Sequence, residues 1–369
     1  MIADMSLRPV PLLLSTLFVL APGSPEALSQ ERGAVVGVAA PLSGPRSSLG
    51  EQLEAGARLA ADASQVSVVE ADTQCSAEGG VEAAETLVEA GSTVVLGFLC
   101  TDALLAALPP LTEAGIPVID IGVRTNRVTD DREKTGHLVW RLAPRSDAEA
   151  AALADWIASN WEGEPFGLIE DGSIANRGLV DTVRRLLADR GLEPSATDNY
   201  RPAEEKQFGL ARRLARTGVT RFLIAGDRPD IAVIARDAAE LGLDLQIVGG
   251  ESLLDETAPD QSLAAGVTAL APPYAHRLEA ADGSPERTLP GYSVLAYAAM
   301  QIAAQAIGAA GETGQPLKEA LDAGSFETIL GPVSFDAKGD ASAVAYQALR
   351  WNGEAFVRED EAGRSAAGG

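Results

Sequence analysis

The chain has 369 residues and a formal net charge of −24, with 53 acidic side chains against 29 basic ones. This excess of negative charge argues against a nucleic-acid partner, because phosphate binding needs a basic surface. The length exceeds a comfortable single hydrophobic core and favours two domains, and an apolar content of 46% is typical of a folded chain and not of a disordered one.

The first 29 residues have the pattern of a secretory signal peptide. Arg8 precedes an uncharged, largely apolar run from Pro9 to Pro22, and Ala27-Leu28-Ser29 forms a small-x-small cleavage site. We therefore expect an exported, periplasmic protein from which the signal peptide is removed. The alternative is an N-terminal membrane anchor that is never cleaved, and Asp4 ahead of the apolar run weakens the signal slightly.

From Ala34 to about residue 143, short apolar runs alternate with helical patterns, which is typical of βαβ units in a mostly parallel sheet. Between the apolar runs, small and apolar residues recur at helical spacing. Four of the runs have the length of strands, and they fall at residues 35–39, 66–70, 94–99 and 116–121.

After residue 144 the same alternation starts again. Strands are expected at residues 166–169, 222–225 and 245–248, with helical patterns between them. Two similar α/β units in one exported chain predict a cleft between the units, and such clefts are favoured places for small molecules.

The last part of the chain has a different character. Helices are predicted at residues 296–310 and 316–323. The segments from Val333 to Phe335 and from Val344 to Trp351 are interpreted as antiparallel strands joined by a turn at residues 336–340. The polar, glycine-rich segment after Val357 is expected to fray.

Cys75 and Cys100 are the two cysteines of the chain. In an oxidising compartment, two thiols and no others suit one structural disulfide, and two buried free thiols are the alternative. Cys100 closes the strand expected at residues 94–99, so Thr101 would stand at the carboxyl end of that strand. Open α/β sheets bind their ligands at this end of their strands.

The sequence offers little catalytic apparatus. His137 and His276 are far apart and lack acidic or cysteine partners at metal-binding spacing, so surface or interface positions are favoured for both. The GxSxG, HExxH and GxxxxGK[ST] motifs are missing, and the first strand leads into GVAAPLSGPRSSLG, which lacks the GxGxxG spacing of a dinucleotide site. We therefore expect no enzyme, no metal and no cofactor.

Four segments in order carry a family resemblance: VVGVAAPLSGPRSSLGEQLEAGARLAAD, CSAEGGVEAAETLVEAGSTVVLGFLCT, IPVIDIGVRTNRVT and GPVSFDAKGD. Together they resemble the type I periplasmic binding proteins of the branched-chain amino acid group, the Leu/Ile/Val-binding proteins that serve ABC importers. The resemblance covers nearly all of the mature chain and includes the cysteine spacing. It implies an α/β fold of two Rossmann-like lobes joined by a three-segment hinge, which closes over a ligand.

The resemblance also divides the chain and implies its function. Residues 1–29 would be the signal peptide, 33–143 with 274–341 lobe one, 144–273 with 342–358 lobe two, and 359–369 a flexible tail. The expected function is delivery of a small polar ligand, an amino acid or a related carboxylate or amine, to ABC permease subunits at the inner membrane, by a monomer. The alternative is a periplasmic sensing module for a separate receptor.

In lobe one, the resemblance implies ligand contacts at Thr101 and in the segment from Gly122 to Arg124. Thr101 would bind the ligand's carboxylate together with backbone N–H groups of the helix that starts at Asp102, and a plain helix N-cap is its alternative role. Arg124 departs from the family's hydroxyl residue. It could hold a carboxylate through a bidentate pair, or it could point to solvent.

In lobe two, Glu251 falls where the family has an acidic residue for the ligand's ammonium, and an exposed loop glutamate is the alternative. If Glu251 is enclosed, a cationic partner is expected. Asp227 replaces a family aromatic residue, and Tyr292 falls near a pocket aromatic position, although a core tyrosine is equally plausible. Because Leu49 and Ala175 also replace aromatic residues, we expect a larger or more polar pocket and natural ligands other than leucine, isoleucine or valine.

Overall fold

The computed structural model describes Met1 and residues 34–64, 66–254, 263–273, 275–278, 287–342 and 346–358. The cleavage site and apolar run of the expected signal peptide and the tail expected at 359–369 lie outside the described residues. Residues 33–369 form one compact unit.

The first sheet has five parallel strands in the order β2-β1-β3-β4-β5. The strands are β1 (Val35–Ala40), β2 (Ser67–Asp72), β3 (Val94–Gly97), β4 (Val118–Asp120) and β5 (Val139–Arg141). The helices along this part are α1 (Ser47–Ser64), α2 (Ala77–Glu89), α3 (Thr101–Glu113) and the short α4 (Arg127–Asp130) and α5 (Arg132–Thr135). The alternation predicted from the sequence is therefore confirmed, and β5 is an addition to it.

The second sheet has seven strands in the order β16-β15-β10-β9-β8-β6-β7. Its strands are β6 (Phe166–Glu170), β7 (Ala196–Asn199), β8 (Arg221–Ala225), β9 (Gln246–Gly249), β10 (Thr268–Ala271), β15 (Gln347–Trp351) and β16 (Phe356–Arg358). The strands β6 to β10 pair in parallel, whereas β15 runs antiparallel to its neighbours β10 and β16. The helices are α6 (Ala148–Asn160), α7 (Ile174–Ala188), α8 (Phe208–Thr217) and α9 (Arg228–Glu240).

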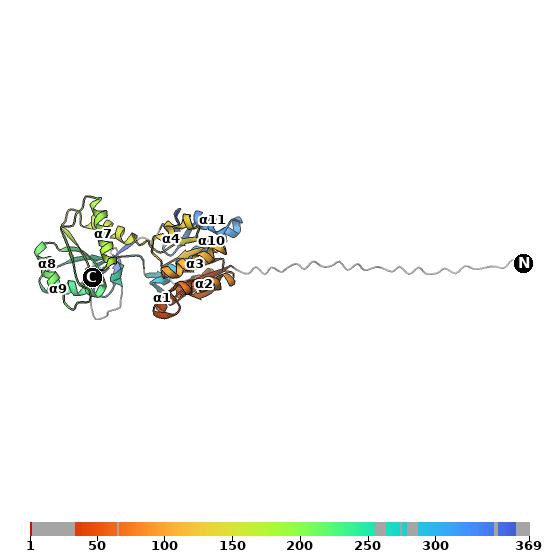
Figure 1. The fold of residues 1–369 in the computed structure, drawn as a ribbon, viewed down its shortest axis with the longest axis horizontal. Helices are drawn as coiled ribbons and strands as arrows, with labels where there is room; N and C mark the ends of the chain where they lie inside the picture. The colour runs from red at the N-terminus through yellow and green to blue at the C-terminus, as the bar shows by residue number, and fades with distance from the viewer. Residues whose placement is uncertain are drawn as a thin grey trace. The chain divides into compact units, whose positions relative to one another are not determined.

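Each sheet is covered by helices on both faces, because successive residues of a buried parallel strand point to opposite sides. In β3, Val94 and Leu96 pack in a core with α1 and α10 (Tyr292–Thr313), while Val95 packs in a core with α2 and α3. In the second sheet, one core includes residues of α8 and α9 and the other includes residues of α6 and α7. Figure 1 shows these helices around the strands.

The helix α10 completes the core of the first sheet, although it comes late in the chain (Figure 1). By length and composition α10 could cross a membrane, but Ala299 and Ile302 are fully buried in the core, as in an internal helix. At its start, Ser293 donates a hydrogen bond of 2.8 Å to the carbonyl of Gln52 in α1. Gly56 of α1 lies so close to Ser293 that a Cβ there would overlap its backbone.

The remaining elements are two small antiparallel pairs and one helix. They are β11 (Ala275–Leu278) with β12 (Arg287–Pro290), β13 (Ser325–Thr328) with β14 (Gly331–Ser334), and α11 (Leu317–Ala323).

The hairpin predicted from residues 333–335 and 344–351 is wrong. Val333 belongs to β14 and pairs with β13, whereas β15 pairs with β10 and β16 in the other sheet. The turn at residues 336–340 exists, but the chain leaves it beside Arg141, which exchanges backbone hydrogen bonds with Gly339 and Ala341. Composition identifies a turn, but the partner of the chain that follows is distant in sequence and is not visible in the pattern.

Candidate functional site

The predicted residues are distributed over the carboxyl ends of strands in both sheets. Thr101 follows β3, Gly122 and Arg124 follow β4, Asp227 follows β8 and Glu251 follows β9. Tyr292 is the exception, because it is the first residue of α10.

A disulfide joins Cys75 and Cys100, whose Cα atoms are 5.3 Å apart. The predicted bond is therefore confirmed, and the alternative of two free thiols is wrong. Cys100 is the N-cap of α3, so the helix begins at Thr101, one residue earlier than expected, and Thr101 is not its N-cap. The side chain of Thr101 is exposed at the first turn of the helix.

The turn between β3 and α3 is held in an uncommon backbone conformation. Phe98 is buried with φ of 62°, in the left-handed region that costs a non-glycine residue about 1–3 kcal/mol. Its N–H donates to the carbonyl of Ala39 at 2.7 Å. Gly97, with φ of 131°, packs so closely against Ala39 that a side chain would not fit. These constraints fix the direction in which Thr101 is presented.

Asp120 organises the turn after β4. Its Oδ1 accepts the N–H groups of Gly122 at 3.1 Å and Val123 at 2.9 Å. The carboxyl is fully buried, and burial raises its pKa to about 7, although the two N–H groups act in the opposite direction. A Cβ at Gly122 would lie 2.6 Å from the side chain of Leu99, so this turn packs against the end of β3.

Arg124 forms an ion pair with Glu251. The two side chains are 22% and 20% exposed, so neither of the solvent-facing alternatives considered for them is correct. The carbonyl of Arg124 accepts the N–H of Ser146 at 2.8 Å, which fixes the backbone that carries the guanidinium. The pair joins a loop of the first sheet to a loop of the second, and Arg124 supplies the cationic partner expected for Glu251.

Two residues that the sequence did not suggest complete this cluster. Glu149, in the first turn of α6, accepts the N–H of Glu251 on its Oε1 at 3.0 Å. Burial raises the pKa of Glu149, and the charge of Arg124 acts in the opposite direction. Tyr346 precedes β15, and burial raises the pKa of its hydroxyl to about 12. Arg124, Glu149, Glu251 and Tyr346 are called the charged cluster below.

Asp227 lies in the neighbouring loop. It is exposed as the N-cap residue of α9, and its carboxylate makes no capping hydrogen bond. Ser252 donates to the carbonyl of Gly226 at 2.7 Å and so ties this loop to the one that carries Glu251. Burial raises the pKa of Tyr200 beneath this loop, and Asp230, Asp171 and Asp227 raise it further, so the loop is acidic, as expected.

Tyr292 lies with the first-sheet core. It is partly buried, packs against that core, and its N–H donates to the Gln52 side chain at 3.3 Å. These contacts correspond to the core interpretation of Tyr292. No contact given for the described residues brings Tyr292 to the charged cluster.

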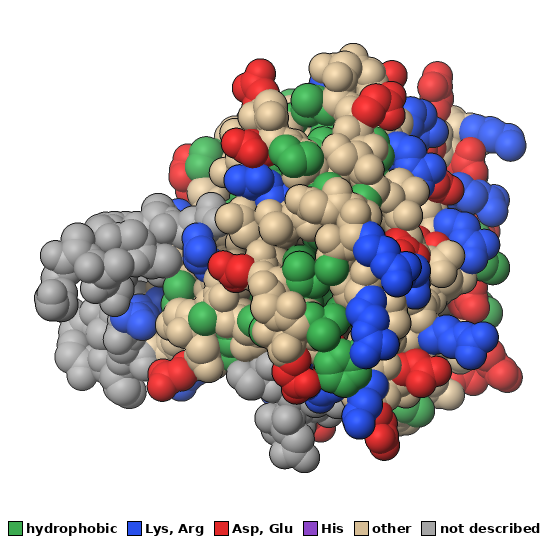
Figure 2. All heavy atoms as spheres, turned by 90° about the vertical axis from the view of Figure 1, so that its left-hand side faces the viewer, with side chains coloured by type: hydrophobic (Ala, Val, Ile, Leu, Met, Phe, Trp, Pro, Cys, Tyr) green, Lys and Arg blue, Asp and Glu red, His purple; other side chains and the backbone are tan. Residues whose placement is uncertain are grey.

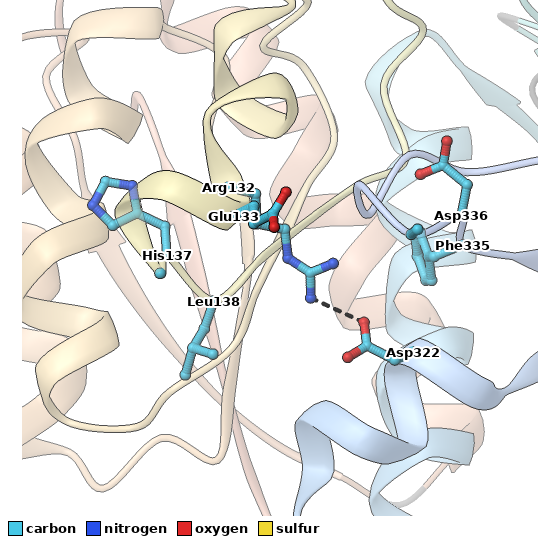
Figure 3. A pocket seen from close by; sticks show the side chains of 9 residues that line it. Arg132, Glu133, His137, Leu138, Asp322, Phe335 and Asp336 are labelled. Atoms are coloured by element: carbon cyan, nitrogen blue, oxygen red, sulfur yellow. Dashed lines mark hydrogen bonds and ion pairs between the residues drawn. The ribbon is translucent and has the colours of Figure 1, made fainter.

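A cavity of about 470 Å³ lies elsewhere, at the amino end of β5 (Figure 3). Arg132 points across it to Asp322, with 2.9 Å between guanidinium nitrogen and carboxylate oxygen, and stacks over the ring of Trp140 at 4.3 Å. His137 also lines this cavity, and burial lowers its pKa. Ligands of open α/β sheets bind at the carboxyl ends of the strands, so this cavity is not the candidate site.

The described residues contain no group of three or more histidine, cysteine or acidic side chains that could hold a metal ion. His276, in β11, is partly buried, and burial lowers its pKa. On the face drawn in Figure 2, basic and acidic side chains are interspersed. Surface ion pairs such as Arg213 with Asp198 account for part of this mixture.

Comparison with known proteins adds independent information. Residues 34–355 match the family described as periplasmic binding protein. The Leu/Ile/Val-binding protein homolog 2 of Brucella abortus (strain 2308) is 25% identical over 346 residues, covering 86% of this chain and 90% of the relative.

Solved structures share the fold. A putative branched-chain amino acid ABC transporter protein from Rhodospirillum rubrum matches with a TM-score of 0.71 and 18% identity, over 88% of this chain and 99% of the other. A solute-binding protein from Rhodopseudomonas palustris BisB5, solved with 3,4-dihydroxybenzoic acid, matches with a TM-score of 0.61 and 19% identity, over 88% and 95%. These likenesses confirm the expected α/β fold class.

Proposed function

Because the chain belongs to the periplasmic binding protein family, we propose that it is an exported solute-binding protein that delivers a small polar ligand to an ABC importer. The ligand is an amino acid or a related carboxylate or amine. The protein acts as a monomer, closes over the ligand by bending at a hinge, and is recognised by the permease in its closed form.

The ion pair between Arg124 and Glu251 is the observation that supports this function most directly. A guanidinium can hold a carboxylate through two parallel hydrogen bonds, and a carboxylate can hold an ammonium. Both groups lie at carboxyl ends of parallel strands, where open α/β sheets bind ligands. A small molecule with a carboxylate, an amine or both finds a complementary charge in this cluster.

The names of the relatives support the same ligand classes. The curated relative from Brucella abortus is named for leucine, isoleucine and valine, and the structure from Rhodopseudomonas palustris contains a benzoic acid. Leucine and a benzoate share a carboxylate, which is the group that Arg124 would hold. The absence of aromatic residues at Leu49 and Ala175 favours ligands other than the branched-chain amino acids.

Isothermal titration calorimetry of the mature protein against amino acids, polyamines, amides and organic acids, including 3,4-dihydroxybenzoate, tests this function. We expect saturable binding of at least one solute at one site per chain, and at least about tenfold weaker binding of a carboxylate by Arg124→Gln. Arg213→Gln, which alters an exposed pair, is the control. A wild-type protein that binds none of these solutes would contradict the proposal.

Hinge closure is tested separately by small-angle X-ray scattering. A bound solute should reduce the radius of gyration of the wild-type protein, whereas Arg124→Gln should show no change at the same solute concentration. An unchanged radius of gyration for a saturated wild-type protein would contradict closure.

A further inference from the structure

Glu149 occupies an unusual place in the charged cluster. It sits in the first turn of α6, and its Oε1 accepts the N–H of Glu251 at 3.0 Å. The neighbouring Gly250 has no side chain, and a Cβ there would collide with the carboxylate of Glu149. The glycine therefore makes room for a second carboxylate next to Glu251.

The charges around Glu149 are unequal in number. The titratable and charged side chains at this position are Arg124, Glu251 and Tyr346. In the described part of the chain, Arg124 is the one charged group that shifts the pKa of Glu149, and Arg124 also forms the ion pair with Glu251. One guanidinium thus faces two carboxylates, so the cluster carries a formal charge of −1 when both are ionised.

The hydroxyl of Tyr346 points to a ligand independently. Its oxygen is buried, and within the described residues it makes no hydrogen bond of normal geometry, although it lies close to Arg124. A buried hydroxyl without a partner costs free energy, and native proteins seldom leave one in this state. A ligand carboxylate held by Arg124 would accept the hydrogen bond that this hydroxyl can donate.

We propose that Glu149 is a specificity-determining residue that selects ligands carrying a protonated amine beside their carboxylate. This inference rests on the proposed function. A ligand carboxylate that takes the guanidinium of Arg124 removes the partner of Glu251. A ligand with an ammonium restores that partner and places its positive charge between Glu251 and Glu149. A carboxylate without an amine brings the formal charge to −2 and leaves two acids without a cation.

Matched solutes that differ only in the amine test this role. Each amino acid is titrated by calorimetry beside the acid that lacks its amine, for example leucine beside 4-methylpentanoate, and 3,4-dihydroxybenzoate is added as an acid without an amine. We expect the wild-type protein to bind an amine-bearing member at least about tenfold more tightly than its partner. Glu149→Gln should weaken the amine-bearing member about tenfold and change the amine-free acid less than about twofold.

The variant is chosen to separate charge from architecture. The amide oxygen of Glu149→Gln can still accept the N–H of Glu251, so the loop keeps its hydrogen bond. The thermal midpoint of the variant checks that the fold is retained. Asp155→Asn, on the same helix but in an exposed pair with Arg190, removes the same charge and should bind as the wild-type protein does.

The pH dependence gives a second measurement. Affinity of the wild-type protein for the amine-bearing member should rise as the pH increases above 4.5, the ordinary value for the carboxyl, because burial raises the pKa of Glu149 and the proton must leave before an ammonium is attracted. Arg124, Glu251 and Tyr346 remain in Glu149→Gln, so the difference between the two profiles reports Glu149 alone.

Each outcome is decisive. Equal discrimination by the wild-type protein and Glu149→Gln overturns the role of Glu149 while leaving solute binding intact. Binding of amine-free acids alone by the wild-type protein also overturns it. Failure of the wild-type protein to bind any solute overturns the proposed function itself and, with it, this inference.

Discussion

Arg141 and Asp340 form a buried ion pair although 199 positions separate them along the chain. Nε of Arg141 lies 2.8 Å from Oδ1 of Asp340, and the guanidinium also donates to Thr125 and Thr129, each at 2.7 Å. Arg145 reaches the second oxygen of Asp340 at 2.7 Å. The pair fastens the end of β5 to the segment that leads from the first sheet to the second.

Asp340→Asn should lower the free energy of unfolding by about 3–5 kcal/mol, because it leaves the fully buried guanidinium of Arg141 without a compensating charge. Urea unfolding followed by circular dichroism measures this loss. Asp155→Asn breaks an exposed pair and should change the free energy by less than about 0.5 kcal/mol. Equal losses in the two variants would contradict a special role for the buried pair.

Asp120 should make the protein less stable as the pH rises. Burial raises its pKa from 3.8 to about 7 in the folded state, so the folded state holds the proton more tightly than the unfolded state. The free energy of unfolding should therefore fall by up to about 4 kcal/mol between pH 4 and pH 8, and level off above that range.

Asp120→Asn removes the titrating group while its amide oxygen still accepts the N–H groups of Gly122 and Val123. We expect a flatter profile of unfolding free energy against pH for this variant, because the neighbouring Arg141 and Asp340 remain. Superimposable profiles for the variant and the wild-type protein would show that Asp120 is not the source of the pH dependence.

Reduction of the disulfide between Cys75 and Cys100 should lower the free energy of unfolding by about 3.5 kcal/mol, the loop-closure value for a separation of 25 residues. Urea unfolding with and without dithiothreitol gives the difference. The doubly substituted variant, Cys75→Ser with Cys100→Ser, should resemble the reduced protein and should not respond to the reductant. A midpoint that reduction leaves unchanged would count against a stabilising bond.

Gly56→Ala should destabilise the protein by about 1–3 kcal/mol, because the new methyl group would overlap the backbone of Ser293 where α1 meets α10. Gly308→Ala is the matched control within α10, where a Cβ meets no atom within 4 Å. It should be stabilising by about 0.5–1 kcal/mol, since alanine favours a helix over glycine. Thermal unfolding of both variants compares them, and the same sign of shift in each would contradict the close packing.

The fold was largely predictable because its strands are buried on both faces. Such strands appear as continuous apolar runs, and the run at residues 94–99 marks both β3 and the following Thr101. Strand order and the partner of the turn at residues 336–340 were not predictable, because they depend on pairing between distant segments. The mistaken hairpin is one result of this limit.

The candidate site was predictable only in part. Arg124 and Glu251 could be identified because each follows a strand, but their ion pair depends on how the two sheets meet. Glu149 lies 102 positions from Glu251 in an ordinary first helical turn, and no sequence pattern distinguishes it from the many exposed acids of the chain. Tyr346, just before β15, was likewise indistinguishable from a core tyrosine.

The late position of α10 governs the order in which an exported chain can fold. The strands β1 to β5 end at Arg141, but the helix that covers one face of their sheet is not present until residues 292–313 have left the membrane. Until then the apolar face of the emerging sheet lacks its cover, so the first core cannot close from one side of the membrane while translocation continues. Completion of that core reports that most of the polypeptide has arrived.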